Sequence, residues 1–200
     1  MGQAFLALYR STGERHWLAR ARASLDFIAA HFSDAEGGYI SAPVAKRANG
    51  VFAKPVRTID QNATVARFAN RLRWYTGDLH YAQLARHALR YLVATAGDET
   101  EMLHAEVLLA DRELGQPPIH ITVVGGKSDP AARALHASAL RYPAEYFQVD
   151  WWDRSEGPLP NPEIRYPTLE RAAAFACTAN SCSTPVFEPS GITAAVRAAL

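Results

Sequence analysis

Apolar residues recur at steps of three and four along most of the first half of the chain, the spacing that places side chains on one face of a helix. This spacing predicts helices over residues 17–32, 65–75, 81–91 and 103–114. After the first of them, Asp34 is followed by Gly37-Gly38-Tyr39, and adjacent glycines favour a turn over continuation of the helix. We therefore expect a long loop that ends near Arg57.

A short motif occurs twice among these helices: Thr12-Gly13-Glu14 is matched by Thr76-Gly77-Asp78. Glycine readily takes the left-handed conformation that ends many helices, and an acidic residue is favoured at the positive amino end of the next helix. The motif therefore predicts helical hairpins. Hairpins with one-sided apolar stripes need neighbours to cover them, which is typical of helical repeats and closed rings.

The pattern changes after Pro117-Pro118 to a β-branched run that ends at Gly125-Gly126 and predicts a strand. We expect a helix capped by Ser128 and a second strand to complete a βαβ unit. Trp151-Trp152 is expected to begin the loop beyond this strand, with its aromatic rings buried against the helices. The elements predicted for this part are strands over 119–124, 146–149 and 172–178, and helices over 131–140 and 192–200.

Together these elements predict an α+β protein. Residues 1–116 form helical hairpins, and residues 117–200 form a small α/β subdomain with three strands. No apolar run approaches the length of about 18 residues that a membrane span requires, and the amino-terminal residues lack the features of a secretory signal. We therefore expect a soluble, cytoplasmic protein.

The formal net charge is only +1, but residues 1–95 carry 13 Lys and Arg against 6 Asp and Glu, whereas residues 96–200 carry 8 against 14. The arginines are spaced along amphipathic helices without a nucleic-acid-binding motif, so solvated helix faces explain them better than a nucleic-acid partner. Gly125-Gly126-Lys127-Ser128 invites a phosphate-binding interpretation. However, Ile121 occupies the position of the first glycine of such a loop, and a strand turning into a capped helix accounts for the same residues.

Five features resemble those of one protein family: the two Thr-Gly turns, Asp34 with Gly37-Gly38-Tyr39, Val123-Val124-Gly125 with Asp129-Pro130, and above all Phe175-Ala176-Cys177 through Cys182-Ser183-Thr184-Pro185. The chain resembles the carboxyl-terminal portion of the YyaL and spermatogenesis-associated family. The resemblance implies a thioredoxin-like domain before a six-hairpin (α/α) toroid of the glycosidase and epimerase kind, of which this chain supplies about two hairpins.

Asp60, Gln61 and Asn62 are the candidate substrate-binding residues. In the toroid that the resemblance implies, they open an inner helix that directs polar groups into a central cavity able to hold a sugar. Thr58 and Gln61 also form a capping-box pattern, which satisfies backbone N–H groups and is the favoured interpretation. No carboxylate is identified as a partner for acid–base chemistry on a glycoside.

Cys177 and Cys182 are the two cysteines and the candidate redox pair. Four intervening residues permit a disulfide. Redox catalysis usually exploits the tighter Cys-x-x-Cys arrangement, so a structural role is favoured. Two cysteines are too few for a disulfide scaffold, which agrees with a reducing compartment. No histidine spacing completes a zinc site, and neither a metal nor a cofactor is expected.

Two classes of function follow. The first is a fragment of a carbohydrate-related protein that binds a sugar ligand, its reaction unspecified. The second is a non-catalytic interaction or assembly module, or a thiol-redox accessory domain using Cys177 and Cys182. We also expect self-association or docking to amino-terminal domains through Phe5, Leu8 and Trp17, because an incomplete ring leaves this side of the first helices uncovered.

Overall fold

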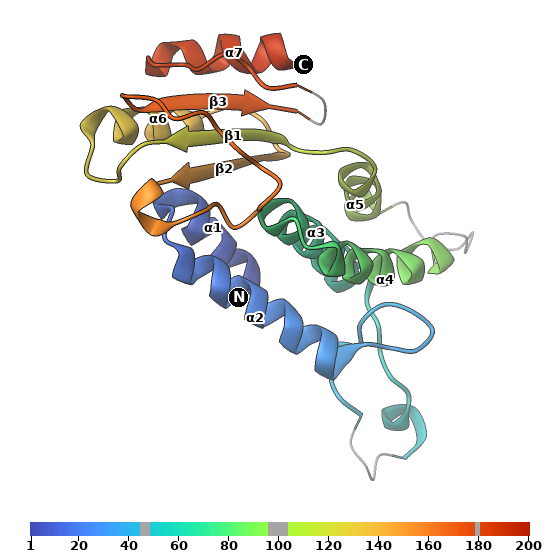
Figure 1. Ribbon diagram of the computed structural model, residues 1–200. Helices are drawn as coiled ribbons and strands as arrows, with labels where there is room; N and C mark the ends of the chain where they lie inside the picture. Colours follow the sequence, from blue (N-terminus) through green and yellow to red (C-terminus); the bar gives the residue numbers. More distant parts are fainter. Residues whose placement is uncertain (45–48, 96–103, 179–180) are drawn as a thin grey trace. The chain divides into compact units, whose positions relative to one another are not determined.

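A computed structural model describes residues 1–44, 49–95, 104–178 and 181–200, and its architecture is α+β, as predicted (Figure 1). Within these residues, the helices are α1 (Gly2–Thr12), α2 (Arg15–Phe32), α3 (Ile59–Thr76), α4 (Leu79–Thr95), α5 (Ala105–Gly115), α6 (Pro130–Leu140) and α7 (Ile192–Ala199). The strands are β1 (Ile119–Val124), β2 (Phe147–Trp152) and β3 (Ala173–Cys177), with short 3-10 turns at Gly50–Ala53, Arg154–Glu156 and Pro189–Gly191. Of the fourth predicted helix, Leu103 lies outside the described residues.

The chain divides into two compact units. The helical unit comprises Met1–Gln3, Ala19–Arg73 and Asp78–Gln116, and the sheet unit comprises Ala4–Leu18, Trp74–Gly77 and Pro117–Leu200. One junction lies after residue 116, where the sequence predicts a domain boundary. Most of α1, the first turn of α2 and the end of α3 nevertheless belong to the sheet unit, because they pack with residues far away in the sequence.

The helical unit is built on small residues of α3, α4 and α5. Ala63, Ala66, Ala88 and Ala110 are almost fully buried and form a core with Leu92 and Tyr39. Alanine costs no side-chain entropy on burial and lets helices approach closely. Arg67 holds the buried Glu113 through two bonds, of 3.0 and 2.6 Å, which tie α3 to α5.

The three strands of the sheet unit lie in the order β2-β1-β3 (Figure 1). β1 pairs parallel with β2, with Ile121 opposite Val149, and antiparallel with β3, with Ile121 opposite Ala176. The prediction that Trp151-Trp152 begins a loop is wrong, since these are the last two residues of β2. Their backbone pairs with Val123 and Val124, and this pairing continues the strand beyond the predicted end.

One face of this sheet is apolar and covered by two helices. Ala132, Leu135 and Ala139 of α6, and Ile192 and Val196 of α7, form a single core with alternate residues of the strands. Asp129, and not the predicted Ser128, caps α6, because its carboxylate accepts the Ala131 N–H at 2.8 Å. Pro130 then fixes a helical φ at the first position of the helix.

The repeated Thr-Gly motif forms the predicted helix ends. Gly13 and Gly77 have φ of +70° and +71°, the left-handed conformation that glycine adopts without a steric penalty. The Asp78 carboxylate then accepts the His80 N–H at 2.9 Å at the start of α4, as expected for an acidic residue at the amino end of a helix.

Phe5, Leu8 and Trp17, which the sequence marks as an uncovered surface, lie in the sheet unit. The rings of Phe5 and Trp17 stack with their centroids 5.9 Å apart, and both residues are half-buried. Leu8 is 38% exposed. Self-association through these residues stays a prediction.

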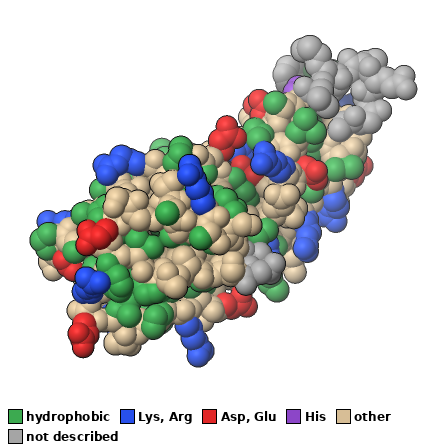
Figure 2. Space-filling view, turned by 90° about the horizontal axis from the view of Figure 1, so that it is seen from above, with side chains coloured by type: hydrophobic (Ala, Val, Ile, Leu, Met, Phe, Trp, Pro, Cys, Tyr) green, Lys and Arg blue, Asp and Glu red, His purple; other side chains and the backbone are tan. Residues whose placement is uncertain are grey.

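On the face of the molecule seen in Figure 2, Lys and Arg side chains are interspersed with Asp and Glu and do not gather by sign. Among the described residues, every helix is too short or too polar to cross a membrane.

Candidate functional site

The second face of the sheet carries buried polar side chains, in contrast to the apolar face that α6 and α7 cover. Side chains alternate between the two faces of a strand. His120 and Thr122 of β1 therefore share this face with Gln148 and Asp150 of β2, and all four residues are buried. Burial of polar groups is costly unless they are hydrogen-bonded, so such a cluster needs a structural or functional reason.

Asp150 is the centre of a hydrogen-bonded network on this face. Its Oδ1 accepts the Tyr9 hydroxyl at 2.6 Å, and its Oδ2 lies 2.7 Å from His120 Nε2. A carboxylate accepts hydrogen bonds, so Nε2 is assigned the imidazole proton. Burial, reinforced by the Asp150 charge, raises the pKa of Tyr9 well above its ordinary value. Tyr9 is therefore the permanent donor of the pair.

The network continues toward β3. Thr122 Oγ1 lies 3.4 Å from His120 Nε2 and accepts the Tyr166 hydroxyl at 2.8 Å. That hydroxyl lies 3.8 Å from Cys177 Sγ. Burial raises the pKa of Tyr166 to about 12, so its proton is retained at neutral pH. A continuous set of polar contacts thus joins the buried carboxylate to the end of β3.

A cavity of about 320 Å³ opens beside this network, at the amino ends of β1 and β2 and the carboxyl end of β3. Strand residues His120, Gln148 and Cys177 form part of its wall. The rest of the wall comprises Trp74, Pro117, Pro118, Asn161, Glu163, Ile164, Arg165, Tyr166, Thr178 and Cys182. It therefore combines one indole ring with groups that donate and accept hydrogen bonds.

No protein-family model and no curated protein matches this chain.

Ligands of open α/β sheets usually bind at the carboxyl ends of the parallel strands, which here is the opposite end of β1 and β2 from the 320 Å³ cavity. A smaller cavity of about 230 Å³ lies there, lined by Gly125, Gly126 and neighbouring residues. Its cations are already engaged. Arg154 donates to the Pro167 carbonyl at 2.5 Å, and the Arg171 guanidinium lies 3.7 Å from the centre of the Phe187 ring.

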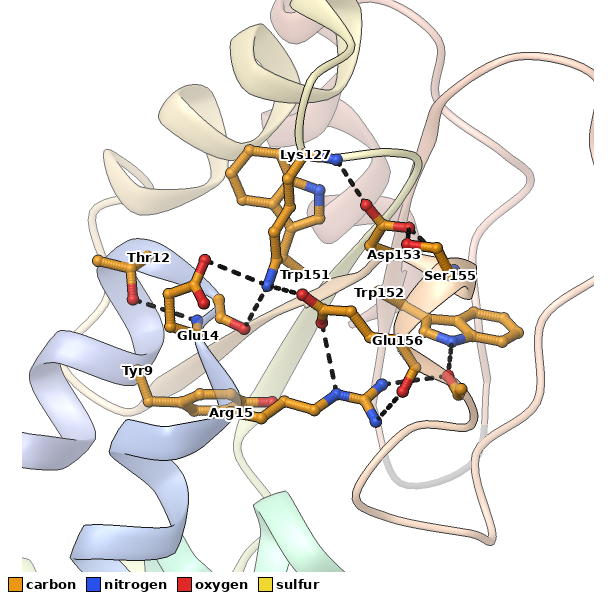
Figure 3. Close-up of polar contacts among 12 residues, drawn as sticks. Tyr9, Thr12, Glu14, Arg15, Lys127, Trp151, Trp152, Asp153, Ser155 and Glu156 are labelled. Atoms are coloured by element: carbon orange, nitrogen blue, oxygen red, sulfur yellow. Dashed lines mark hydrogen bonds and ion pairs between the residues drawn. The ribbon is translucent and has the colours of Figure 1, made fainter.

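Lys127, the lysine of the Gly-Gly-Lys-Ser segment, points toward acidic side chains (Figure 3). Its Nζ donates to the Gly13 carbonyl at 2.9 Å, forms a close ion pair with Glu156, and lies 3.6 Å from Glu14. Its backbone N–H donates to Asp153 at 2.8 Å. The Nζ and the backbone N–H of Lys127, which would bind a phosphate, both interact with groups of the protein. This agrees with the structural interpretation of the segment.

The predicted substrate-binding residues Asp60, Gln61 and Asn62 lie at the start of α3 in the helical unit. Asp60 and Gln61 are exposed, whereas Asn62 is fully buried. The pKa of Asp60 is lowered by the Thr58 hydroxyl and by the backbone N–H of Gln61. Thr58 Oγ1 does not accept a hydrogen bond from Gln61, so the reciprocal Thr58–Gln61 capping box is not formed.

Asn62 uses its whole amide within the protein. Its Oδ1 accepts the Tyr39 N–H at 2.7 Å, and its Nδ2 donates to the Tyr39 carbonyl at 3.0 Å and to the Thr58 carbonyl at 2.9 Å. The structure therefore brings Asn62 together with the Gly37-Gly38-Tyr39 turn and leaves Asp60 and Gln61 at the surface.

Cys177 and Cys182, the candidate redox pair, form a disulfide. The sequence left this pairing open. Both residues line the 320 Å³ cavity, so they belong to the same site as His120 and Tyr166. Within the described residues, no three His, Cys, Asp or Glu side chains converge as a metal site requires.

Sequence reasoning missed His120, Asp150, Tyr166 and Trp74. One signal for the first two was present, since polar residues alternate with apolar ones in both predicted strands of the βαβ unit. Alternation usually marks a face in contact with water. Here α1, through Tyr9, and the loop that carries Tyr166 cover that face. The sequences of the strands do not predict this covering.

The burial of His136 on α6 leads us to expect that the stability of the protein depends on pH. Its Nε2 lies 3.0 Å from the Arg10 carbonyl and its ring lies 4.5 Å from that of Trp151. Burial lowers the pKa of His136 below its ordinary value of 6.5. As the pH falls below about 6.5, the unfolded chain binds a proton that the folded protein resists, so stability decreases until the folded pKa is passed. Thermal unfolding of H136Q across this range should show a weaker dependence than wild type. An unchanged pH profile would contradict the assignment.

Proposed function

We propose that the sheet unit is a binding module for a small, uncharged, hydroxyl-rich ligand of the monosaccharide class, held in the 320 Å³ cavity. The main support for the proposal is that an indole ring and several hydrogen-bonding side chains line a single cavity. Its volume is at the lower end of the range of about 300–1,000 Å³ typical of ligand pockets.

The chemistry of the wall supports this ligand class. Hydroxyl groups both donate and accept hydrogen bonds, and the wall offers Arg165 as a donor, Glu163 as an acceptor, and the amide of Gln148, which has both capacities. The indole of Trp74 and the rings of Pro117 and Pro118 provide apolar surface for the C–H face of a sugar ring. The opposite charges of Arg165 and Glu163 give no net preference for an anion.

The small number of carboxylates in this wall favours binding of a sugar without cleavage of a glycosidic bond. Hydrolysis of a glycoside usually needs two carboxyl groups on opposite sides of the bond. Among the described residues of this wall, Glu163 is the one carboxylate, because Asp150 is buried against Tyr9 and His120. We therefore propose a binding module and not a glycosidase.

We also propose that the chain is related to the YyaL and spermatogenesis-associated family. The support for this relationship is the sequence from Phe175 to Pro185 and the repeated Thr-Gly turns. A complete toroid needs more hairpins than this chain contains, so the carbohydrate-related activity of such a ring is not assigned to it.

Ligand binding is tested with a panel of monosaccharides and short oligosaccharides, using the fluorescence of the tryptophans and the thermal midpoint of the wild-type protein. We expect at least one sugar to raise the midpoint, since a ligand that binds only the folded state stabilises it by mass action. R165A should weaken binding about tenfold or more, because a hydrogen bond to a charged group contributes about 1.5–3 kcal/mol.

The matched control is R141A, which removes an exposed arginine at the end of α6 outside the cavity wall and should leave binding unchanged. E163A and E145A form a second matched pair of exposed glutamates. A panel in which no sugar at millimolar concentration shifts the midpoint, or in which R165A and R141A bind equally well, contradicts the proposal. It then favours a non-catalytic interaction module.

A further inference from the structure

The disulfide between Cys177 and Cys182 closes a segment that is already held by other bonds. Inside this segment the Thr178 N–H donates to the Ser181 carbonyl at 2.9 Å, and just outside it the Ser183 N–H donates to the Ala176 carbonyl at 2.8 Å. The hydroxyls of Thr178 and Ser181 both donate to the Ala199 carbonyl at 3.1 Å. The bridge is therefore not the sole restraint that keeps the two cysteines adjacent.

The entropic benefit of a disulfide grows with the length of the loop that it closes. The two cysteines are only five positions apart in the sequence. A short loop that is also fixed by main-chain and hydroxyl hydrogen bonds gains comparatively little from a covalent bridge. Opening the bridge should thus leave the fold intact and the two sulfurs close enough to pair again.

The two sulfurs have different surroundings. Cys177 is the last residue of β3 and is 7% exposed, whereas Cys182 is exposed. Both residues line the 320 Å³ cavity, which gives a small thiol a route of approach. The hydroxyl of Tyr166 lies 3.8 Å from Cys177 Sγ. An attacking thiol therefore meets Cys182 first, and a charge that develops on Cys177 has a hydroxyl donor beside it.

We infer that Cys177 and Cys182 form a reversible thiol–disulfide exchange site for a low-molecular-weight thiol, with Cys182 as the attacked sulfur and Cys177 as the leaving thiolate. The inference does not depend on the sugar ligand proposed above. It assigns a chemical role to the polar contacts that end at β3.

The exchange proceeds in two balanced steps. A thiolate of the reductant attacks Cys182 Sγ and forms a mixed disulfide, while the bond between Cys182 and Cys177 breaks and its electron pair leaves on Cys177 Sγ. A second molecule of the thiol attacks the mixed disulfide, releases the oxidised reductant and leaves Cys182 as a thiolate. Two electrons pass from two thiols to the bridge, and the two thiol protons end on the two cysteines.

Tyr166 stabilises the first leaving group. In the bridged protein its proton is donated to Thr122 Oγ1 at 2.8 Å. When Cys177 carries a negative charge, rotation of the same hydroxyl directs this proton to Sγ. A leaving thiolate that is stabilised departs faster, so Tyr166 should accelerate opening of the bridge without affecting reactions of an isolated Cys182 thiol.

The test uses reduced glutathione and the native full chain. We expect the bridge to open while the circular dichroism of the folded protein persists, and alkylation followed by peptide mapping should locate the mixed disulfide on Cys182. In single-cysteine variants, the Cys182 thiol of C177S should react with a chromogenic disulfide about tenfold or more faster than the Cys177 thiol of C182S, since exposure governs access.

Y166F should slow opening of the bridge about threefold or more, because it removes the hydroxyl donor that faces the negative charge developing on Cys177 Sγ. Y142F removes a hydroxyl from another half-buried tyrosine of the sheet unit and is the control. The mapping in wild type does not depend on either variant. A bridge that glutathione opens only after the protein unfolds, or a mixed disulfide located on Cys177, overturns the inference and leaves a purely structural disulfide.

Discussion

Replacing Asp150 by alanine is expected to lower the free energy of unfolding of the sheet unit by about 2–6 kcal/mol, the cost of leaving two buried hydrogen-bond donors without an acceptor. Asp150 is 2% exposed and accepts hydrogen bonds from Tyr9 and His120. Alanine leaves both donors buried without their acceptor, and each such group costs about 1–3 kcal/mol. Urea denaturation followed by tryptophan fluorescence measures the change, since Trp151 and Trp152 lie in this unit.

E145A, at an exposed glutamate just before β2, is the control and should change stability by no more than about 0.5 kcal/mol. Y9F separates the two hydrogen bonds of Asp150. Combined with D150A it should cost clearly less than the sum of the single changes, because the two residues share one interaction. A loss below about 1 kcal/mol for D150A would falsify the view that this network holds the polar face of the sheet together.

The second large effect is expected in the helical unit. N62A should destabilise that unit by about 3 kcal/mol or more, because it leaves the N–H and carbonyl of Tyr39 without the amide that pairs with them. Asn62 is fully buried, so water does not replace the lost bonds. Hydrogen exchange of the backbone amides in α3 and α4 provides the measurement, since it reports stability segment by segment.

Gln61, the exposed neighbour of Asn62, supplies the matched control. Q61A should leave exchange within about 0.5 kcal/mol of wild type, as is usual for surface substitutions. Equal effects of N62A and Q61A would contradict the structural role of Asn62. They would return both residues to consideration as ligand-binding groups.

The site was less predictable than the fold, and particular residues show why. The cysteines were visible in the sequence as a pair, but their proximity to Tyr166 depends on a proline-rich loop returning to β1 and β3. Trp74 lies within the helix predicted over residues 65–75, outside its apolar stripe, and carries no mark of a ligand-binding role. It lines the cavity because the end of α3 belongs to the sheet unit.

Elements that depend on local spacing and backbone chemistry were predictable from the amino-acid sequence. Steps of three and four specified α2, α3, α4 and α5, a β-branched run specified β1, and Thr-Gly marked the helix ends at Gly13 and Gly77. Tertiary contacts set the direction of β3, the end of β2 at Trp152 and the pairing of Asp150 with Tyr9 and His120. These features arise from contacts between residues distant in the chain, whose free energy no local pattern records.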